Sequence, residues 1–298
     1  MSRFQIGFNT DQHLPFTQLL ERWQLLEELG CDHAWVADHL LPWWTDEQHL
    51  TQQQVPWDDG SRRDDTDYLE GWTLVAALLA RTERMRGGIL VSNNLFRHPA
   101  LVAKMAATVD QVSGGRFNLG LGAGWFEPEH VAYGFDYPAP GRRVERFGEA
   151  VQIISSLLRD ERVSFAGRHY QLDNAPFAPR PAPGAVPLVI GANGPRMLRL
   201  AARYAAVWSC EGSPATVAER GAQLNAACVA CGRAPSDIRW SFYGYPATIG
   251  GDPLASAAEF KRLIEPYRAV GVGEVILELP DVFDERVVEE IVALVQEW

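Results

Sequence analysis

Seven residues at positions 38–44 combine the side chains of a reactive pocket, and they follow directly on a short apolar segment. They read Asp-His-Leu-Leu-Pro-Trp-Trp. An imidazole can accept or donate a proton near neutral pH, a carboxylate can orient it, and bulky aromatic rings can form a wall beside a turn fixed by Pro42. Asp38, His39 and Trp43 are therefore candidate catalytic residues. The alternative is a hydrogen-bonded structural histidine beside two packing tryptophans.

Short apolar strands alternate with amphipathic helices along the whole chain, and this alternation has to position the 38–44 segment. We expect strands over 4–8, 34–37, 86–91, 116–121, 188–190, 206–209, 238–243 and 275–277. We expect helices over 16–29, 71–82, 99–113, 142–158, 196–204, 214–231, 255–269 and 284–295. Eight strand–helix units without a break in composition indicate an α/β fold, a single-domain (β/α)8 TIM barrel with insertions over residues 1–298, rather than a doubly wound sheet.

Three stretches interrupt the alternation. Residues 40–69 are polar and rich in Gln and Asp, so we interpret them as an inserted loop in the position of a lid. Residues 122–140 are expected to be a loop after the fourth strand. Residues 163–187 are proline-rich and are expected to form a second insertion that includes a small hairpin.

In a (β/α)8 barrel, ligands bind where the strands end. The residues that follow the eight strands are therefore pocket candidates, and most of them are polar or glycine. They are Asn9, Asp38, His39, Pro42, Trp43, Ser92, Asn93, Asn94, Gly122, Ala123, Gly124, Trp125, Gly191, Ala192, Asn193, Gly194, Pro195, Glu211, Gly212 and Glu278.

The segment 191–196, Gly-Ala-Asn-Gly-Pro-Arg, is the strongest signal for an anion. Its two glycines leave backbone N–H groups accessible, Pro195 suits the first position of a helix, and the helix N-terminus carries partial positive charge. Arg196 could add a full charge to a bound phosphate. The alternative is a tight strand–helix turn that uses glycine for its geometry alone. Because barrels often hold phosphate late in the chain, we favour the phosphate.

Gly120, Gly122 and Gly124 form a GxGxG motif that is a weak signature for a dinucleotide. The third glycine of that signature is absent at its required spacing, and no acidic residue ends the next strand. In a barrel the same glycines would let the backbone approach a flat ring.

The composition narrows the classes of partner. A net charge of −11 over 298 residues argues against a grip on nucleic acid or on an anionic membrane surface, and no apolar run has the ~20 residues of a membrane helix. Four cysteines are too few for a disulfide framework and fit a reducing cytoplasm. Cys228 and Cys231 form a CxxC without a second pair, so we expect packing cysteines and no metal site.

Several blocks of this sequence resemble the luciferase-like monooxygenase superfamily, whose barrels bind FMN or the deazaflavin F420. The resemblance covers nearly the whole chain. The blocks that carry it are 113–125 (SGGRFNLGLGAGW), 69–74 (LEGWTL), 96–100 (FRHPA) and the segment from Gly194-Pro195 through 198–205 (LRLAARYA).

The 38–43 segment is similar to the one that F420-dependent members use at the deazaflavin. This resemblance implies that His39 lies near the reactive carbon or the substrate oxygen, that Trp43 lines the pocket, and that F420 is the cofactor, with FMN as the alternative. It also implies a cis peptide bond between non-proline residues near Ile89–Leu90, with the backbone of the third and fourth strand ends along the ring.

One departure bears on the substrate. The sugar-phosphate dehydrogenases of this family carry a glutamate as general acid after the fourth strand, where this chain has Trp125. The resemblance therefore implies hydride transfer to or from a small organic substrate without identifying a sugar phosphate.

Three other functions compete with this hypothesis. An FMN-dependent monooxygenase would use oxygen and a separate reductase, and a flavin-binding protein without catalysis is a known fate in the superfamily. A barrel glycosidase could use Glu211 and Glu278 as its carboxylate pair, but it explains neither the 191–196 turn nor the 38–43 segment.

The resemblance also implies a homodimer that pairs through its early helices.

Overall fold

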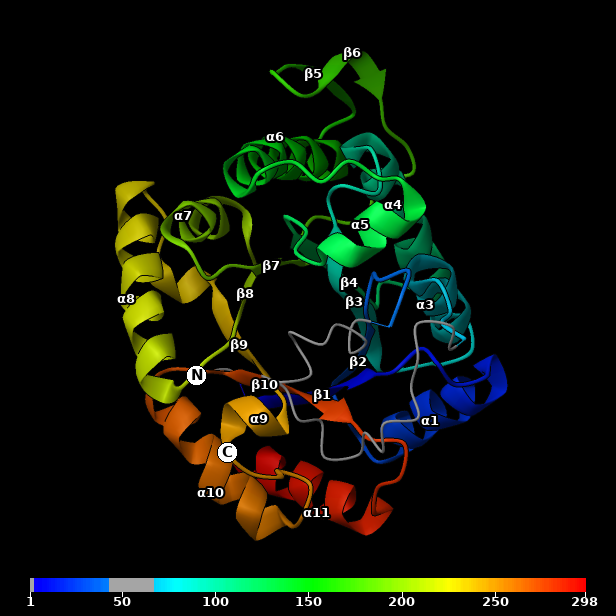
Figure 1. Cartoon of the computed structure of the whole chain (residues 1–298), viewed down its shortest axis with the longest axis vertical. Helices are drawn as coiled ribbons and strands as arrows, with labels where there is room; N and C mark the ends of the chain where they lie inside the picture. Colours follow the sequence, from blue (N-terminus) through cyan, green and yellow to red (C-terminus); the bar gives the residue numbers. More distant parts are fainter. Residues whose placement is uncertain (1–2, 43–66) are drawn as a thin grey trace.

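A closed barrel of eight parallel strands forms the centre of the protein in a computed structural model that describes residues 3–42 and 67–298 (Figure 1). Around the barrel the strands follow the order β1-β2-β3-β4-β7-β8-β9-β10, and β10 pairs with β1 to close it. The strands are β1 (Gln5–Thr10), β2 (His33–Val36), β3 (Arg86–Asn93), β4 (Phe117–Gly122), β7 (Leu188–Gly191), β8 (Val207–Cys210), β9 (Arg239–Gly244) and β10 (Glu274–Leu279). The predicted TIM barrel is confirmed, with every barrel strand at its expected place.

Helices surround the barrel and bury one apolar face each against it. The long ones are α1 (Phe16–Glu28), α3 (Gly71–Leu79), α4 (Pro99–Ser113), α6 (Pro140–Arg159), α7 (Pro195–Tyr204), α8 (Pro214–Ala230), α10 (Ala257–Ala269) and α11 (Glu285–Gln296). In α6, Phe147, Val151 and Ile154 are buried at the spacing of one helix face. In α4, Val102, Ala106 and Val109 are buried, whereas Leu101 and Val112 are 51% and 49% exposed.

The insertions contain more structure than the sequence indicated. A short helix, α5 (Glu127–Tyr133), lies in the stretch 122–140 that was expected to be a loop. Its seven residues are too few to show a helical period, and Gly134 ends it in the left-handed conformation. The hairpin in 163–187 is confirmed as β5 (Arg162–Ala166) and β6 (Gln171–Pro176), which stand beyond α6 in Figure 1. Most of the expected lid, residues 43–66, lies outside the described residues.

The remaining short elements are α9 (Pro246–Ile249) and a 3-10 turn at Pro235–Asp237. Among the helices that the structure describes, none has the length and apolar character to cross a membrane.

A buried polar cluster at the strand starts holds β2, β9 and β10 together. Ser241 Oγ donates to Glu274 Oε1 at 2.7 Å, Arg239 Nη1 donates to Oε2 at 3.0 Å, and His33 Nε2 lies 3.5 Å from Oε1. Burial opposes ionisation of Glu274, but its interactions with His33, Arg239 and Ser241 outweigh burial and lower its pKa to about 2.

Replacing Glu274 with glutamine is expected to destabilise the protein at pH 7. Because the folded-state pKa lies below the unfolded one, the ionised carboxylate stabilises the fold above about pH 4.5, and this stabilisation is lost as the pH falls toward 2. Urea unfolding should show a loss of about 3 kcal/mol at pH 7 and less than half of that loss at pH 3. Glu289→Gln, at an exposed site on α11, is the control. An equal loss at both pH values would contradict the linkage.

Candidate active site

A pocket of about 450 Å³ opens at the carboxyl ends of the barrel strands. Its wall takes residues from seven of the barrel strands or the loops that follow them, all but β10, and from the start of α7. The lining residues are Asn9, Ala37, Asp38, His39, Leu90, Val91, Asn93, Gly122, Ala123, Gly124, Trp125, Gly191, Ala192, Asn193, Gly194, Met197, Ser209, Glu211, Tyr243 and Tyr245.

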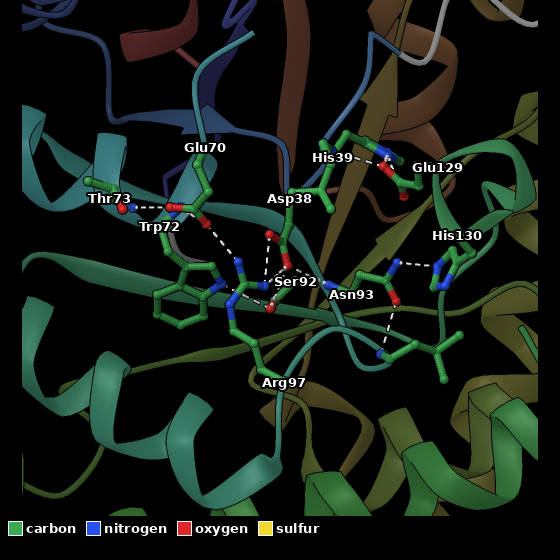
Figure 2. A network of polar contacts seen from close by, with 12 residues as sticks. Asp38, His39, Glu70, Trp72, Thr73, Ser92, Asn93, Arg97, Glu129 and His130 are labelled. Atoms are coloured by element: carbon green, nitrogen blue, oxygen red, sulfur yellow. Dashed lines mark hydrogen bonds and ion pairs between the residues drawn. The ribbon is translucent and has the colours of Figure 1, made fainter. Parts of the chain in front are cut away.

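The Asp38 carboxylate is buried at the centre of a network of polar contacts (Figure 2). Its Oδ2 accepts hydrogen bonds from Ser92 Oγ at 3.0 Å and from the Asn93 backbone N–H at 2.8 Å. Arg97 Nη1 donates to both oxygens, at 2.9 and 2.7 Å, and Nη2 donates to Glu70 Oε1 at 2.6 Å. Burial raises the pKa of Asp38, and the Arg97 charge and the Asn93 amide oppose that rise. Asp38 therefore ties the loop after β2 to the end of β3.

Glu70 connects this network to the start of α3. Its carboxylate accepts from the backbone N–H groups of Trp72 and Thr73, at 3.1 and 2.7 Å, and so caps the helix. Burial opposes ionisation of Glu70, but these hydrogen bonds and the Arg97 charge outweigh it and lower its pKa. Trp72 Nε1 also donates to Ser92 Oγ at 3.1 Å. The 69–74 block thus supports the pocket from outside it.

His39 lies at the pocket with one ring nitrogen occupied by a buried carboxylate (Figure 2). Its Nδ1 is 3.1 Å from both oxygens of Glu129, whose side chain is fully buried on α5. The rings of Trp125 and Phe126 make T-shaped contacts with the imidazole ring, at centroid distances of 5.4 and 5.6 Å. The imidazole is held by one polar and two aromatic neighbours.

His130, the next residue on α5, supports the other side of the pocket. Its Nε2 is 3.0 Å from Asn93 Nδ2, and Asn93 Oδ1 accepts from the Leu95 backbone N–H at 3.0 Å. Burial lowers the pKa of His130, which favours the neutral ring that can accept from the Asn93 amide. Two consecutive residues of α5 therefore fix two walls of one pocket.

The end of β3 contributes backbone and apolar side chains to the pocket. Leu90 and Val91 line it and are joined by a cis peptide bond, one residue beyond the expected Ile89–Leu90 position. Ile89 is fully buried in the core, and Ser92 points toward Asp38. A Cβ atom on Gly122 would lie 2.5 Å from Val91 Cγ2, so that glycine makes room for the β3 wall.

The loop that was expected to bind an anion lies partly in the pocket. Gly191, Ala192, Asn193 and Gly194 line it, whereas Pro195 and Arg196 are exposed and do not. A Cβ atom on Gly194 would meet nothing within 4 Å, which leaves space in front of the N-terminus of α7.

The guanidinium beside this loop comes from α8. Arg220 Nη1 donates to Asn193 Oδ1 and to the Glu211 backbone oxygen, both at 2.9 Å. Arg220 was not among the predicted site residues, because its sequence surroundings are those of an ordinary helix.

The other candidate residues fall in different places. Trp43 lies outside the described residues. Trp125 lines the pocket and is 44% exposed. Glu211 also lines the pocket, and burial raises its pKa, while Glu278 accepts from Asn9 Nδ2 at 3.1 Å and is not a lining residue. The two carboxylates of the glycosidase hypothesis thus do not share the pocket wall.

Sequence reasoning missed four residues of the supporting network: Glu70, Arg97, Glu129 and His130. Glu70 and Arg97 stand in the blocks 69–74 and 96–100, which resemble the family but do not by themselves give a role to each side chain. For Glu129 and His130 the sequence feature that could have predicted a short helix is Pro128 near its start together with Gly134 at its end.

Metal ligation has no support in the parts of the chain that the structure describes, where no group of three His, Cys, Asp or Glu side chains could hold an ion. Cys228 and Cys231 are free, and only Cys231 is exposed. Burial raises the pKa of Cys228, which keeps it an unreactive thiol.

Comparison with known proteins gives a family and several relatives. A family model described as luciferase-like monooxygenase matches residues 1–281. An F420-dependent glucose-6-phosphate dehydrogenase of Microbacterium testaceum (strain StLB037) is 36% identical over 204 residues, which are 68% of this chain and 54% of that protein. The pyrimidine monooxygenase RutA of Stutzerimonas stutzeri (strain A1501) is 33% identical over 55% of this chain and 47% of that protein. The chain spans about half the length of the curated relatives it matches.

Solved structures share the fold at lower identity. An F420-dependent secondary alcohol dehydrogenase in complex with an F420-acetone adduct superposes with a TM-score of 0.79 at 22% identity, over 97% of this chain and 99% of that one. EDTA monooxygenase (EmoA) from Chelativorans sp. BNC1 also gives 0.79, at 15% identity, over 99% of this chain and 94% of that one.

Proposed function

The chain belongs to the luciferase-like monooxygenase family of F420- and flavin-dependent oxidoreductases, and we propose that it is an F420-dependent member that acts on a small organic substrate. The observation that carries this proposal is that His39 and the 191–194 loop line one pocket. The cofactor named in the matching dehydrogenases is F420, and one neighbour of the same fold holds it as an adduct.

The pocket residues fit the parts of such a cofactor. Leu90 and Val91 offer an apolar wall for a flat ring, and Asn93 offers polar atoms at its edge. Backbone at 191–194 and the N-terminus of α7 suit a phosphate, and the Arg220 charge lies against Asn193. When bound, F420 supplies a ring carbon, C5, that accepts or donates a hydride.

His39 has the position of a proton-handling group in this reaction. Oxidising an alcohol to a carbonyl releases a proton from the hydroxyl, and the reverse reaction needs one at the carbonyl oxygen. An imidazole can serve both directions, because it can either accept or donate a proton near neutral pH. Among the described lining residues, His39 alone combines a titratable ring with a contact to a buried carboxylate.

Asp38 takes a different role from the catalytic one that its sequence position indicated. All of its contacts point toward Ser92, Asn93 and Arg97, so we assign it to positioning the pocket wall. The pocket role of Trp43 stays a prediction. The expected homodimer also stays a prediction, which light scattering on a sizing column would test.

The substrate of the matching sugar-phosphate dehydrogenases is not carried over. The exposed indole of Trp125 stands at the pocket where the resemblance places their acidic residue. We propose an uncharged alcohol or carbonyl compound, which an aromatic wall and one imidazole can orient.

Spectral titration with F420 and FMN, side by side, tests the cofactor. We expect F420 to bind at micromolar concentration or below with a shift of its visible absorbance, and FMN to bind at least tenfold more weakly. Tight FMN binding with oxygen consumption would instead establish a monooxygenase, which the RutA match supports. Tight F420 binding without turnover on a panel of alcohols, aldehydes, ketones and enones would indicate a binding protein.

A further inference from the structure

We infer that Glu129 is the positioning residue for His39, and that it fixes the imidazole in the tautomer whose Nε2 lone pair faces the pocket. The geometric part of this inference concerns the chain alone. Its catalytic consequence rests on the proposed function.

The first observation is the contact itself. His39 Nδ1 lies 3.1 Å from each oxygen of Glu129, and the Leu40 backbone N–H donates to Glu129 Oε2 at 2.9 Å. The Glu129 side chain has no exposed surface, so water does not compete for these oxygens. One carboxylate thus binds the ring and the backbone of the same segment, which leaves the imidazole little freedom to turn.

The second observation is chemical. An ionised carboxylate only accepts hydrogen bonds, so the nitrogen that faces it must carry the proton. A neutral His39 therefore has its hydrogen on Nδ1 and a lone pair on Nε2. Among the residues that the structure describes, no side chain or backbone group bonds to this Nε2, and His39 lines the pocket.

The third observation concerns the neighbouring rings. Trp125 and Phe126 pack against each other and each meets the imidazole in a T-shaped contact, which restricts the rotation of the ring. Because Phe126 precedes α5 and Glu129 is in its first turn, this short helix provides both the aromatic and the ionic contact. This sequence has Trp125 where the sugar-phosphate dehydrogenases have a glutamate. Glu129, four residues later, provides a carboxylate that contacts Nδ1 of His39.

The consequence for the proposed reaction is a directed proton transfer. As an alcohol is oxidised, its carbon would transfer a hydride to the bound F420 of the proposed function, its hydroxyl O–H bond breaks, and the proton passes to the His39 Nε2 lone pair. The imidazolium that forms keeps its Nδ1–H on Glu129, which balances the new charge at the point where it arises. When a carbonyl is reduced, Nε2 donates the same proton to the carbonyl oxygen.

The test is a nitrogen-15 spectrum of histidine-labelled, cofactor-free protein at pH 8. The His39 signal is assigned by its loss in His39→Gln. We expect wild type to show a protonated Nδ1 and an unprotonated Nε2. Glu129→Leu, which removes both acceptors, should move His39 toward the Nε2–H tautomer that free histidine prefers, whereas Glu127→Gln, on an exposed residue of the same helix, should leave the signal unchanged.

Kinetics add a readout for the catalytic consequence. Glu129→Gln keeps the shape but loses the charge and one acceptor, so turnover should fall on the order of 100-fold while F420 affinity changes by less than about threefold.

A wild-type spectrum with hydrogen on Nε2 would overturn the inference whatever cofactor binds. An Nδ1–H spectrum in a protein that binds FMN and not F420 would leave Glu129 as the positioning residue and remove only the proposed function. Should Glu129→Leu not fold, the wild-type and Glu129→Gln spectra still decide.

Discussion

Replacing His39 with alanine is expected to lower turnover by about 10²- to 10⁴-fold, the range that a positioned acid–base group contributes. The affinity for F420 should change by less than about tenfold, because the ring wall and the 191–194 loop remain in place. Turnover should fall because no other titratable ring lines the described pocket wall beside a buried carboxylate.

Single-turnover kinetics together with a fluorescence titration of F420 separate the two quantities. His98→Asn is the matched control, since His98 is an exposed N-cap of α4 outside the pocket and asparagine serves as an N-cap equally well. If His39→Ala weakened cofactor binding as much as turnover, His39 would be a binding residue and the proton-transfer role would fail.

Replacing Arg97 with leucine is expected to destabilise the protein by about 3–5 kcal/mol, the cost of leaving one partner of a buried ion pair without compensation. The side chain of Asp38 is 1% exposed and receives two of its hydrogen bonds from Arg97. Without the guanidinium, burial would favour protonation of Asp38 and loosen the link from β2 to β3.

Urea denaturation measures this effect, with an unchanged m-value as evidence that the unfolded state is not altered. Arg159→Leu is the control: its pair with Asp160 is exposed on both sides, so the loss there should be much smaller than for Arg97→Leu. The double variant Arg97→Leu with Asp38→Asn should be more stable than Arg97→Leu alone, because the buried charge is gone. Similar losses for Arg97→Leu and Arg159→Leu would show that the buried pair stabilises no more than a surface pair.

Periodicity in the sequence was sufficient for the fold and for the broad location of the site. Strand and helix patterns depend on neighbours within a few residues, and eight of each, in alternation, admit few architectures. The place of Asp38 and His39 after the second strand then followed from the rule that barrels bind ligands at strand ends. The resemblance added the family, which the comparisons confirm.

Pairings between distant residues were not available from the sequence. His39 and Glu129 are 90 residues apart, and Asp38 and Arg97 are 59 apart. No local pattern states which carboxylate will neutralise which cation, because that depends on how β2, β3 and α5 meet after folding.

The sequence by itself therefore determined the barrel, the family and the candidate imidazole. Only the tertiary structure decided that Asp38 pairs with Arg97, that Arg196 is exposed while Arg220 lies at the 191–194 loop, and that Glu129 binds one nitrogen of His39. The physical reason is the range of the interactions: backbone periodicity is written in adjacent residues, whereas buried hydrogen bonds and ion pairs form between whichever polar groups the packed elements bring within about 3 Å of one another.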